Sequence, residues 1–431
     1  MANVLAFMKT YWVALLSGLA ALVFMGVGVL GMMSDSVVQE MQQRVRDAGP
    51  IGLLRSSPKN PDAIRVEAER GAQFQEEYER TRTVARRINE RKPLLSNVFP
   101  VLEGEPAAYE FRDAYVRAVQ QLPLGKLQGG DRPGERDVQE AREEIQELAL
   151  RQQEEMDAAA SAKSGTAVSG GPPRPSSPTP VLPAPRWGAM VDVAGAGTGP
   201  QAGDPGTDER VRAAVTKARS IRCYVSSDPA RPSFHFSPIW DRSVRPTPED
   251  MWYAQVGLWI QQDIVDAIAD LNDEAARPLK PDEVYVENMP VKRLQSVRVF
   301  GYVTTKDRVP FPMYAGMASG AAAGDFVTSF TGRKSAPDSA FDVVQFQVTA
   351  VVDQRALLRL IDRITKQNFY KLVSLNYLAV KPGDQDYTEG YMYGAAPVVR
   401  ADLIFEGYLA RDVYEPLFPA EVRERLGLGK K

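Results

Sequence analysis

The stretch FDVVQFQVTAVVDQRALLRLIDRI, residues 341–364, constrains the fold of this chain more than any other stretch of its sequence. Apolar side chains alternate with polar ones from Val344 to Val352, and this period of two predicts a half-buried β-strand. After Asp353, a good N-cap, the leucine and isoleucine residues follow a helical period. The strand therefore joins a helix almost directly, so the helix must return over the sheet that contains the strand.

The same order of elements occurs twice in the second half of the chain. The first helix is predicted to begin at Thr247, a favourable N-cap, with Pro248 in its first turn and an apolar stripe that reaches Leu271. The strands of the two units are predicted at 291–303, 341–352, 370–380 and 396–409. One four-stranded antiparallel sheet with both helices on one face would bury all these stripes, so we predict an α+β domain.

Near the N-terminus, residues 12–33 read WVALLSGLAALVFMGVGVLGMM and carry no charge. Such a helix spans about 33 Å, close to the thickness of the hydrocarbon layer of a membrane. A cleaved signal peptide and a soluble core helix are the alternatives, but GMMSDSVV offers no convincing cleavage site. We therefore expect one uncleaved transmembrane helix with residues 1–11 inside and the rest outside. Four glycines would allow close packing of this helix against another: Gly18, Gly26, Gly28 and Gly31.

The region 34–160 is predicted to be mainly helical. One predicted helix has the a/d pattern of a coiled coil. Its residues at spacings of 4, 3, 4 and 3 are Phe74, Tyr78, Thr81, Ala85 and Ile88. This helix is either a stalk that pairs with a partner helix or an amphipathic helix packed on its own domain. Residues 161–207 are rich in Pro, Gly, Ser and Ala and predict a disordered linker.

The scarcity of reactive side chains excludes much chemistry. The chain has one cysteine, Cys223, and one histidine, His235, so no intrachain disulfide and no Cys/His metal site can form, and we expect no cofactor. A net charge of -3 gives no basic field for nucleic acid. Carboxylate chemistry is the remaining enzymatic option, and its candidate pairs are Asp263 with Asp266 and Asp384 with Asp386.

An N-terminal anchor, a coiled-coil-like stalk and a paired helix-strand-strand unit resemble the PilO/PilN-type alignment subunits of type IV pilus and type II secretion machines. The stretch PVKRLQSVRVFGYV, followed by the 341–364 unit, is similar to PilO-like domains, in which a strand leads into the helix of the second repeat. The helical region 94–160, the linker and an insertion at 304–340 depart from the pattern. The chain therefore resembles an enlarged, divergent relative.

The resemblance implies a single-pass protein of the bacterial inner membrane, with a ferredoxin-like outer domain in the periplasm and no catalytic residues. The implied partners are a second copy or a second PilN/PilO-like membrane protein, together with pilus or secretion components. The predicted organisation is a cytoplasmic tail at 1–11, a membrane helix at 12–33, a stalk at 34–160, a linker at 161–207, the ferredoxin-like domain at 208–415 and a C-terminal tail at 416–431.

Three functions follow from these observations. The first is a non-enzymatic membrane scaffold that dimerises through its stalk and through a strand edge at Val399, Ala401, Leu403 and Phe405. The second is a membrane-anchored extracytoplasmic binding or sensor protein, whose sheet face or 304–340 loop, with Phe311, Tyr314 and Phe326, would contact a ligand. The third is an anchored enzyme that uses the carboxylate pairs.

Overall fold

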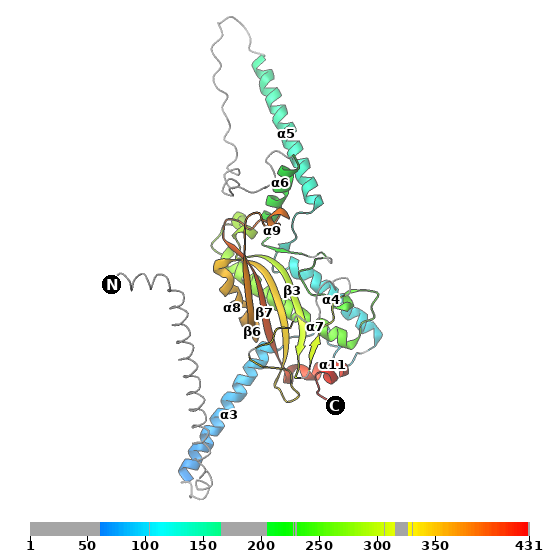
Figure 1. Cartoon of the computed structure of the whole chain (residues 1–431), viewed down its shortest axis with the longest axis vertical. Helices are drawn as coiled ribbons and strands as arrows, with labels where there is room; N and C mark the ends of the chain where they lie inside the picture. Colours follow the sequence, from blue (N-terminus) through cyan, green and yellow to red (C-terminus); the bar gives the residue numbers. More distant parts are fainter. Residues whose placement is uncertain are drawn as a thin grey trace, which may run out of the picture. The chain divides into compact units, whose positions relative to one another are not determined.

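The structure is a computed structural model, and it describes residues 61–102, 104–164, 205–226, 228, 231–305, 307–314, 326–329 and 331–429. The chain divides into two compact units, Met1–Thr83 and Val84–Lys431. In the first unit the described residues belong to helix α3, which begins at Pro61 and ends at Asn89 in the second unit. The second unit is an α+β domain built around one mixed sheet (Figure 1).

The sheet has seven strands in the order β1-β2-β3-β5-β7-β6, and β4 pairs with β3. Its strands are β1 Gly129–Gly130, β2 Cys223–Val225, β3 Val291–Val303, β4 Arg308–Pro310, β5 Phe341–Asp353, β6 Tyr370–Val380 and β7 Val398–Ala410. The strands β3, β5, β7 and β6 pair antiparallel, whereas β1 and β2 add to β3 in parallel. The strand predicted from the 344–352 alternation lies in the middle of this sheet.

The helices of the second unit are α4 Glu105–Leu124, α5 Glu135–Ser164, α6 Pro205–Ser220, α7 Pro248–Ala276, α8 Leu357–Gln367, α9 Gln385–Thr388, α10 Arg411–Tyr414 and α11 Ala420–Arg425. Helices α7 and α8 lie on the same face of the sheet (Figure 1). The predicted N-cap of α7 is confirmed, because the Thr247 hydroxyl accepts a hydrogen bond from the Asp250 backbone N–H at 3.1 Å.

The predicted fold is wrong in the size and type of its sheet. We expected four antiparallel strands in a ferredoxin-like domain, and the structure has seven strands with parallel additions at one edge. The additions come from Cys223–Val225 and from a two-residue strand between α4 and α5. Strands this short carry too few residues to show a period of two, so their pairing depends on tertiary contacts.

The residues on either side of the predicted ferredoxin-like domain also belong to the second unit. Helix α4 buries Phe111, Tyr115 and Val119 in the main core, although its region was predicted to be part of a stalk. At the other end, Phe418 packs against Trp252 with ring centroids 5.1 Å apart, so the described part of the predicted C-terminal tail, residues 416–429, is not a simple tail. An amphipathic stripe shows that a helix has a partner, but it does not identify the partner.

No helix in the described part of the chain, residues 61–429 with the gaps given above, is long and apolar enough to cross a membrane. This finding counts against the predicted single-pass topology and inner-membrane location. The predicted span 12–33, with Gly18, Gly26, Gly28 and Gly31, lies outside the described residues. Most of the predicted linker (165–204) and the middle of the 304–340 insertion (315–325) also lie outside them.

The close pairing of β3 with β4 depends on one glycine inside β3, Gly301, which lies opposite Pro310. Gly301 has φ +138°, and a Cβ placed there would lie 2.1 Å from the carbonyl oxygen of Val309. The β3–β5 register shifts between Val299 and Gly301, which marks a bulge. A side chain at this position would therefore force β3 and β4 apart.

Candidate interaction surfaces

Helix α3 exposes most of the side chains that were predicted to pair. Phe74 and Tyr78 are 63% and 61% exposed, and Ile88 is 42% exposed. Thr81 is also exposed, and Ala85 is half-buried. We call these five residues the α3 stripe. Large apolar side chains arranged at heptad spacing on one helix match the requirements of helix-in-groove or coiled-coil recognition.

The end of α3 is anchored in the second unit through the buried side chain of Asn89. Its amide nitrogen donates to Asn368 Oδ1 at 2.9 Å and to the Tyr408 carbonyl at 2.8 Å. Its amide oxygen accepts from the Ala410 backbone N–H at 2.6 Å, and the Tyr414 hydroxyl donates to the Asn89 carbonyl. One polar residue thus connects α3 to the ends of α8 and β7.

A second set of contacts follows directly after α3. Arg91 Nη2 donates to Asp263 Oδ1 at 2.9 Å and to the Gln367 carbonyl at 3.2 Å, while the Tyr370 hydroxyl donates to Asp263 Oδ2 at 2.7 Å. Burial raises the pKa of the Asp263 carboxyl, and the Arg91 guanidinium opposes this shift. Together, Asn89, Arg91, Asp263, Asn368 and Tyr370 form what we call the anchor network. Only Asp263 of these five residues was a candidate from the sequence, because the contacts of the network join segments far apart in the chain.

The carboxylates that were candidates for catalysis have separate structural partners. Asp263 belongs to the anchor network, whereas Asp266 forms an ion pair with Lys126 at 2.7 Å. Asp384 accepts from the backbone N–H of Lys381 at 2.7 Å. Asp386 accepts from the Tyr393 hydroxyl at 2.9 Å and pairs with Arg293 at 3.1 Å. The two acids of each pair therefore have different hydrogen-bond and ion-pair partners.

His235 and Cys223 are both buried. His235 Nδ1 accepts from the Val299 backbone N–H at 3.3 Å, and burial lowers its pKa to about 4. Burial raises the pKa of the Cys223 thiol to about 12, which makes a reactive thiolate unfavourable. Among the described residues, no three His, Cys, Asp or Glu side chains are grouped so that they could hold a metal ion.

The predicted strand edge is wrong, because β7 pairs with β5 on one side and with β6 on the other. Its apolar residues Val399, Ala401, Leu403 and Phe405 are buried in the main core. The last strand of the sheet on this side is β6, which follows α8 in sequence. Strand order depends on which distant segments pair, and the period of a single strand does not contain that information.

The aromatic residues of the 304–340 insertion are packed, not presented to solvent. Phe311 stacks on Tyr253 with ring centroids 4.6 Å apart, and Phe326 lies 5.9 Å from the ring of Phe300. Tyr314 is half-buried, and its backbone N–H donates to the Phe236 carbonyl. These positions argue against the predicted use of the three aromatics as ligand contacts.

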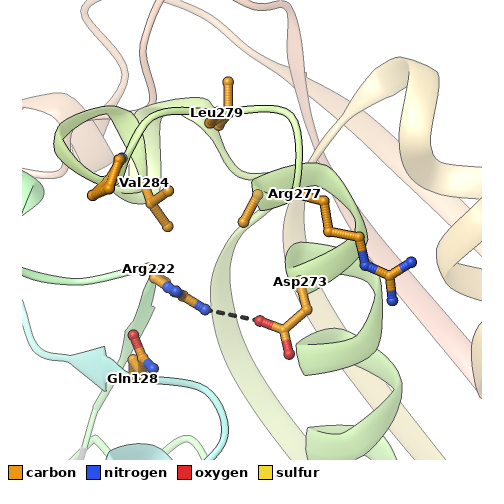
Figure 2. Close-up of a pocket in the computed structure, with 8 residues that line it drawn as sticks. Gln128, Arg222, Asp273, Arg277, Leu279 and Val284 are labelled. Carbon is orange, nitrogen blue, oxygen red and sulfur yellow. Dashed lines mark hydrogen bonds and ion pairs between the residues drawn. The ribbon is translucent and has the colours of Figure 1, made fainter.

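An open depression of about 670 Å³ lies beside the end of helix α7. Its lining includes Gln128, Arg222, Asp273, Arg277, Leu279 and Val284. Figure 2 shows Arg222 and Asp273 facing each other, with the Arg277 side chain directed away from them, and Arg222 donates to Asp273 at 2.8 Å. An ion pair in an open depression is an ordinary surface feature, so we assign no function to this pocket.

The chain was compared with known protein families, curated proteins and solved structures. No protein-family model, no curated protein and no solved structure matches the chain.

Proposed function

We propose that this chain is a non-enzymatic interaction protein that acts as a scaffold by pairing through helix α3, either with a second copy or with a chain of similar build. The observation that supports this proposal best is the α3 stripe. Its aromatic residues Phe74 and Tyr78 are more exposed than buried. Aromatic side chains that become buried between partners are among the strongest contributors to binding, so a matching helix would gain most from covering these two.

The residues beside the stripe favour a specific helical partner over unspecific aggregation. With Phe74 at d and Tyr78 at a, Glu77 takes the g position and Arg82 the following e position. In a parallel pair, Glu77 of one helix faces Arg82 of the other, which opposes wrong registers. Other charged residues of α3, such as Arg80, lie away from the stripe and keep the remaining surface of the helix soluble.

The anchor network supports a role in which a displacement of helix α3 by its partner is transmitted to the folded domain. Through the five side chains of the anchor network, Asn89 and Arg91 connect the end of α3 to α7, to the residue after α8 and to β6. Asn89 also reaches β7 through backbone atoms of Tyr408 and Ala410. All five side chains are buried or half-buried. A helix used only as a spacer would not need a buried polar network, since such networks are destabilising when a member is lost. The non-enzymatic part of the proposal rests on the separate structural partners of the candidate acids.

The setting that we propose is an assembly such as a pilus or secretion machine, in which the chain would position other subunits. This part of the proposal derives from the resemblance of the repeated helix-strand-strand order, which runs here from α7 through β7. It makes the α3 partner a helix of a second copy or of a related subunit.

Cysteine crosslinking of the full chain tests the pairing of α3. Tyr78→Cys places a thiol at an a position, where two parallel helices would bring equivalent residues together. Thr83→Cys is the matched control, because residue 83 lies on the opposite side of the helix at 100° per residue. We expect disulfide-linked dimers from Tyr78→Cys and far fewer from Thr83→Cys.

A charge at the neighbouring d position provides the second arm of the test. Phe74→Glu, added to Tyr78→Cys, should abolish the linkage, and Ala72→Glu on the far side of the helix should leave it intact. Both substituted positions are exposed, so neither change should unfold the domain. Equal linkage of Tyr78→Cys and Thr83→Cys would refute pairing through the α3 stripe.

A further inference from the structure

The two edges of the sheet differ, and the difference indicates a second interaction surface. At one edge, β1 and β2 have two and three residues, and β4, which covers part of β3, ends in Pro310. Short strands and proline prevent an edge from pairing with other chains. The opposite edge is β6, which has 11 residues, and among the described residues only β7 pairs with it.

Strand β6 has one irregularity, a register shift between Leu372 and Ser374, and beyond it the strand contains no charge and no proline. Between Lys371 and Lys381 its sequence, LVSLNYLAV, carries no charge. All five residues from 375 to 379 are exposed, and Leu375, Tyr377 and Leu378 are 38%, 52% and 64% exposed. A long uncharged edge with apolar side chains pairs readily with another strand.

We propose that β6 pairs antiparallel with β6 of a second copy, about a two-fold axis that passes through Tyr377. This residue is the midpoint of the exposed stretch 375–379. In this register, Leu375 lies opposite Ala379 of the second copy, Tyr377 lies opposite its own equivalent, and Asn376 lies opposite Leu378. The five exposed residues are then paired only with one another.

The face on which these residues lie supports a second copy as the occupant. Leu375 and Tyr377 pair with Leu403 and Ala401 of β7, whose side chains belong to the core covered by the helices. Leu375, Tyr377 and Ala379 therefore share that face, because alternate residues of a strand point the same way. Pairing about Tyr377 places apolar residues against apolar residues across the axis, which extends the core from one copy into the next.

The two lysines that flank the uncharged stretch select the register. An axis through Asn376 would place Lys371 directly opposite Lys381 of the second copy, and like charges at opposite positions are destabilising. An axis through Leu378 would place Lys381 opposite Leu375 in the apolar row. The axis through Tyr377 avoids both arrangements.

Cysteine crosslinking of the full chain tests this register, and the native sequence suits the test because its single cysteine, Cys223, is buried. Tyr377→Cys would place two thiols directly opposite, with Cα atoms about 4.5–5.5 Å apart, within the range of a disulfide. Asn376→Cys is the matched control, because its thiols would be diagonal neighbours about 7–8 Å apart. We expect Tyr377→Cys to form linked dimers roughly tenfold faster than Asn376→Cys.

Two further variants complete the experiment. The double variant Asn376→Cys with Leu378→Cys should link as well as Tyr377→Cys, because it restores directly opposite thiols. Adding Phe74→Glu to Tyr377→Cys should leave the linkage unchanged, which separates this surface from the α3 stripe. Equal rates for Tyr377→Cys and Asn376→Cys, or no linkage of either in a folded protein, would overturn the proposal.

Discussion

Replacing Asn89 with alanine should lower the free energy of unfolding by about 3 kcal/mol. The substitution removes three hydrogen bonds of 2.6–2.9 Å, each to an atom of a buried residue. It leaves the Ala410 backbone N–H without its acceptor, and an unsatisfied buried donor is destabilising by about 1–3 kcal/mol. The Tyr408 carbonyl and Asn368 Oδ1 each lose one donor, but Asn368 Oδ1 still accepts from the Phe369 backbone N–H. The loss of these two hydrogen bonds therefore lowers the free energy of unfolding by a smaller amount than the loss of the acceptor for Ala410.

Urea unfolding followed by tryptophan fluorescence measures this loss. Trp259 is a suitable reporter, because its indole N–H donates to the Lys92 carbonyl at 3.0 Å, three residues beyond Asn89. Arg87→Ala is the control, since Arg87 is exposed on the same helix and its loss should change stability by no more than about 0.5 kcal/mol. A loss of less than about 1 kcal/mol for Asn89→Ala would refute the view that this residue fastens α3 to the domain.

Three other predictions concern the core. Burial lowers the pKa of His235 from 6.5 to about 4, so between pH 4 and pH 6.5 the unfolded state binds more protons than the folded state. The free energy of unfolding should therefore fall by about 3 kcal/mol as the pH drops from 6.5 to 4. Urea titrations at several pH values should show this fall and show it reduced in His235→Gln. Burial lowers the pKa of Lys292 to about 8, so stability should rise from pH 8 toward 10, and this rise should be absent from urea titrations of Lys292→Met. Gly301→Ala should lower stability by about 2 kcal/mol or more, measured by thermal unfolding, because its Cβ would clash with Val309 and its φ is +138°.

Local patterns in the sequence were enough to predict several elements of the sheet domain. The cap at Thr247, the strand around Phe346 and the helix after Asp353 all occur as expected. Each of these features is encoded within a few turns of chain, by a cap or by a period of two or 3.6 residues. Such signals depend little on what the segment packs against.

The features that failed or were missed depend on distant parts of the chain. The position of β7 inside the sheet is fixed by pairing with β5 and β6, and the contacts of Asn89 join residues about 280 to 320 positions apart. The helix containing Phe111 was assigned to a stalk, because its stripe gave no indication that the main core would cover it. The position of β6 at the edge depends on the strand order, which no local pattern in the sequence contains.

The unequal edges of the sheet also limit how large an assembly built through β6 can become. A sheet with two bare edges can add further copies without end, as fibrils do. Here the described strands leave one long edge available, and the other is interrupted by short strands and by Pro310. A second copy paired with β6 would therefore occupy the one long edge that the described strands leave free. Assembly through this surface would stop at two chains.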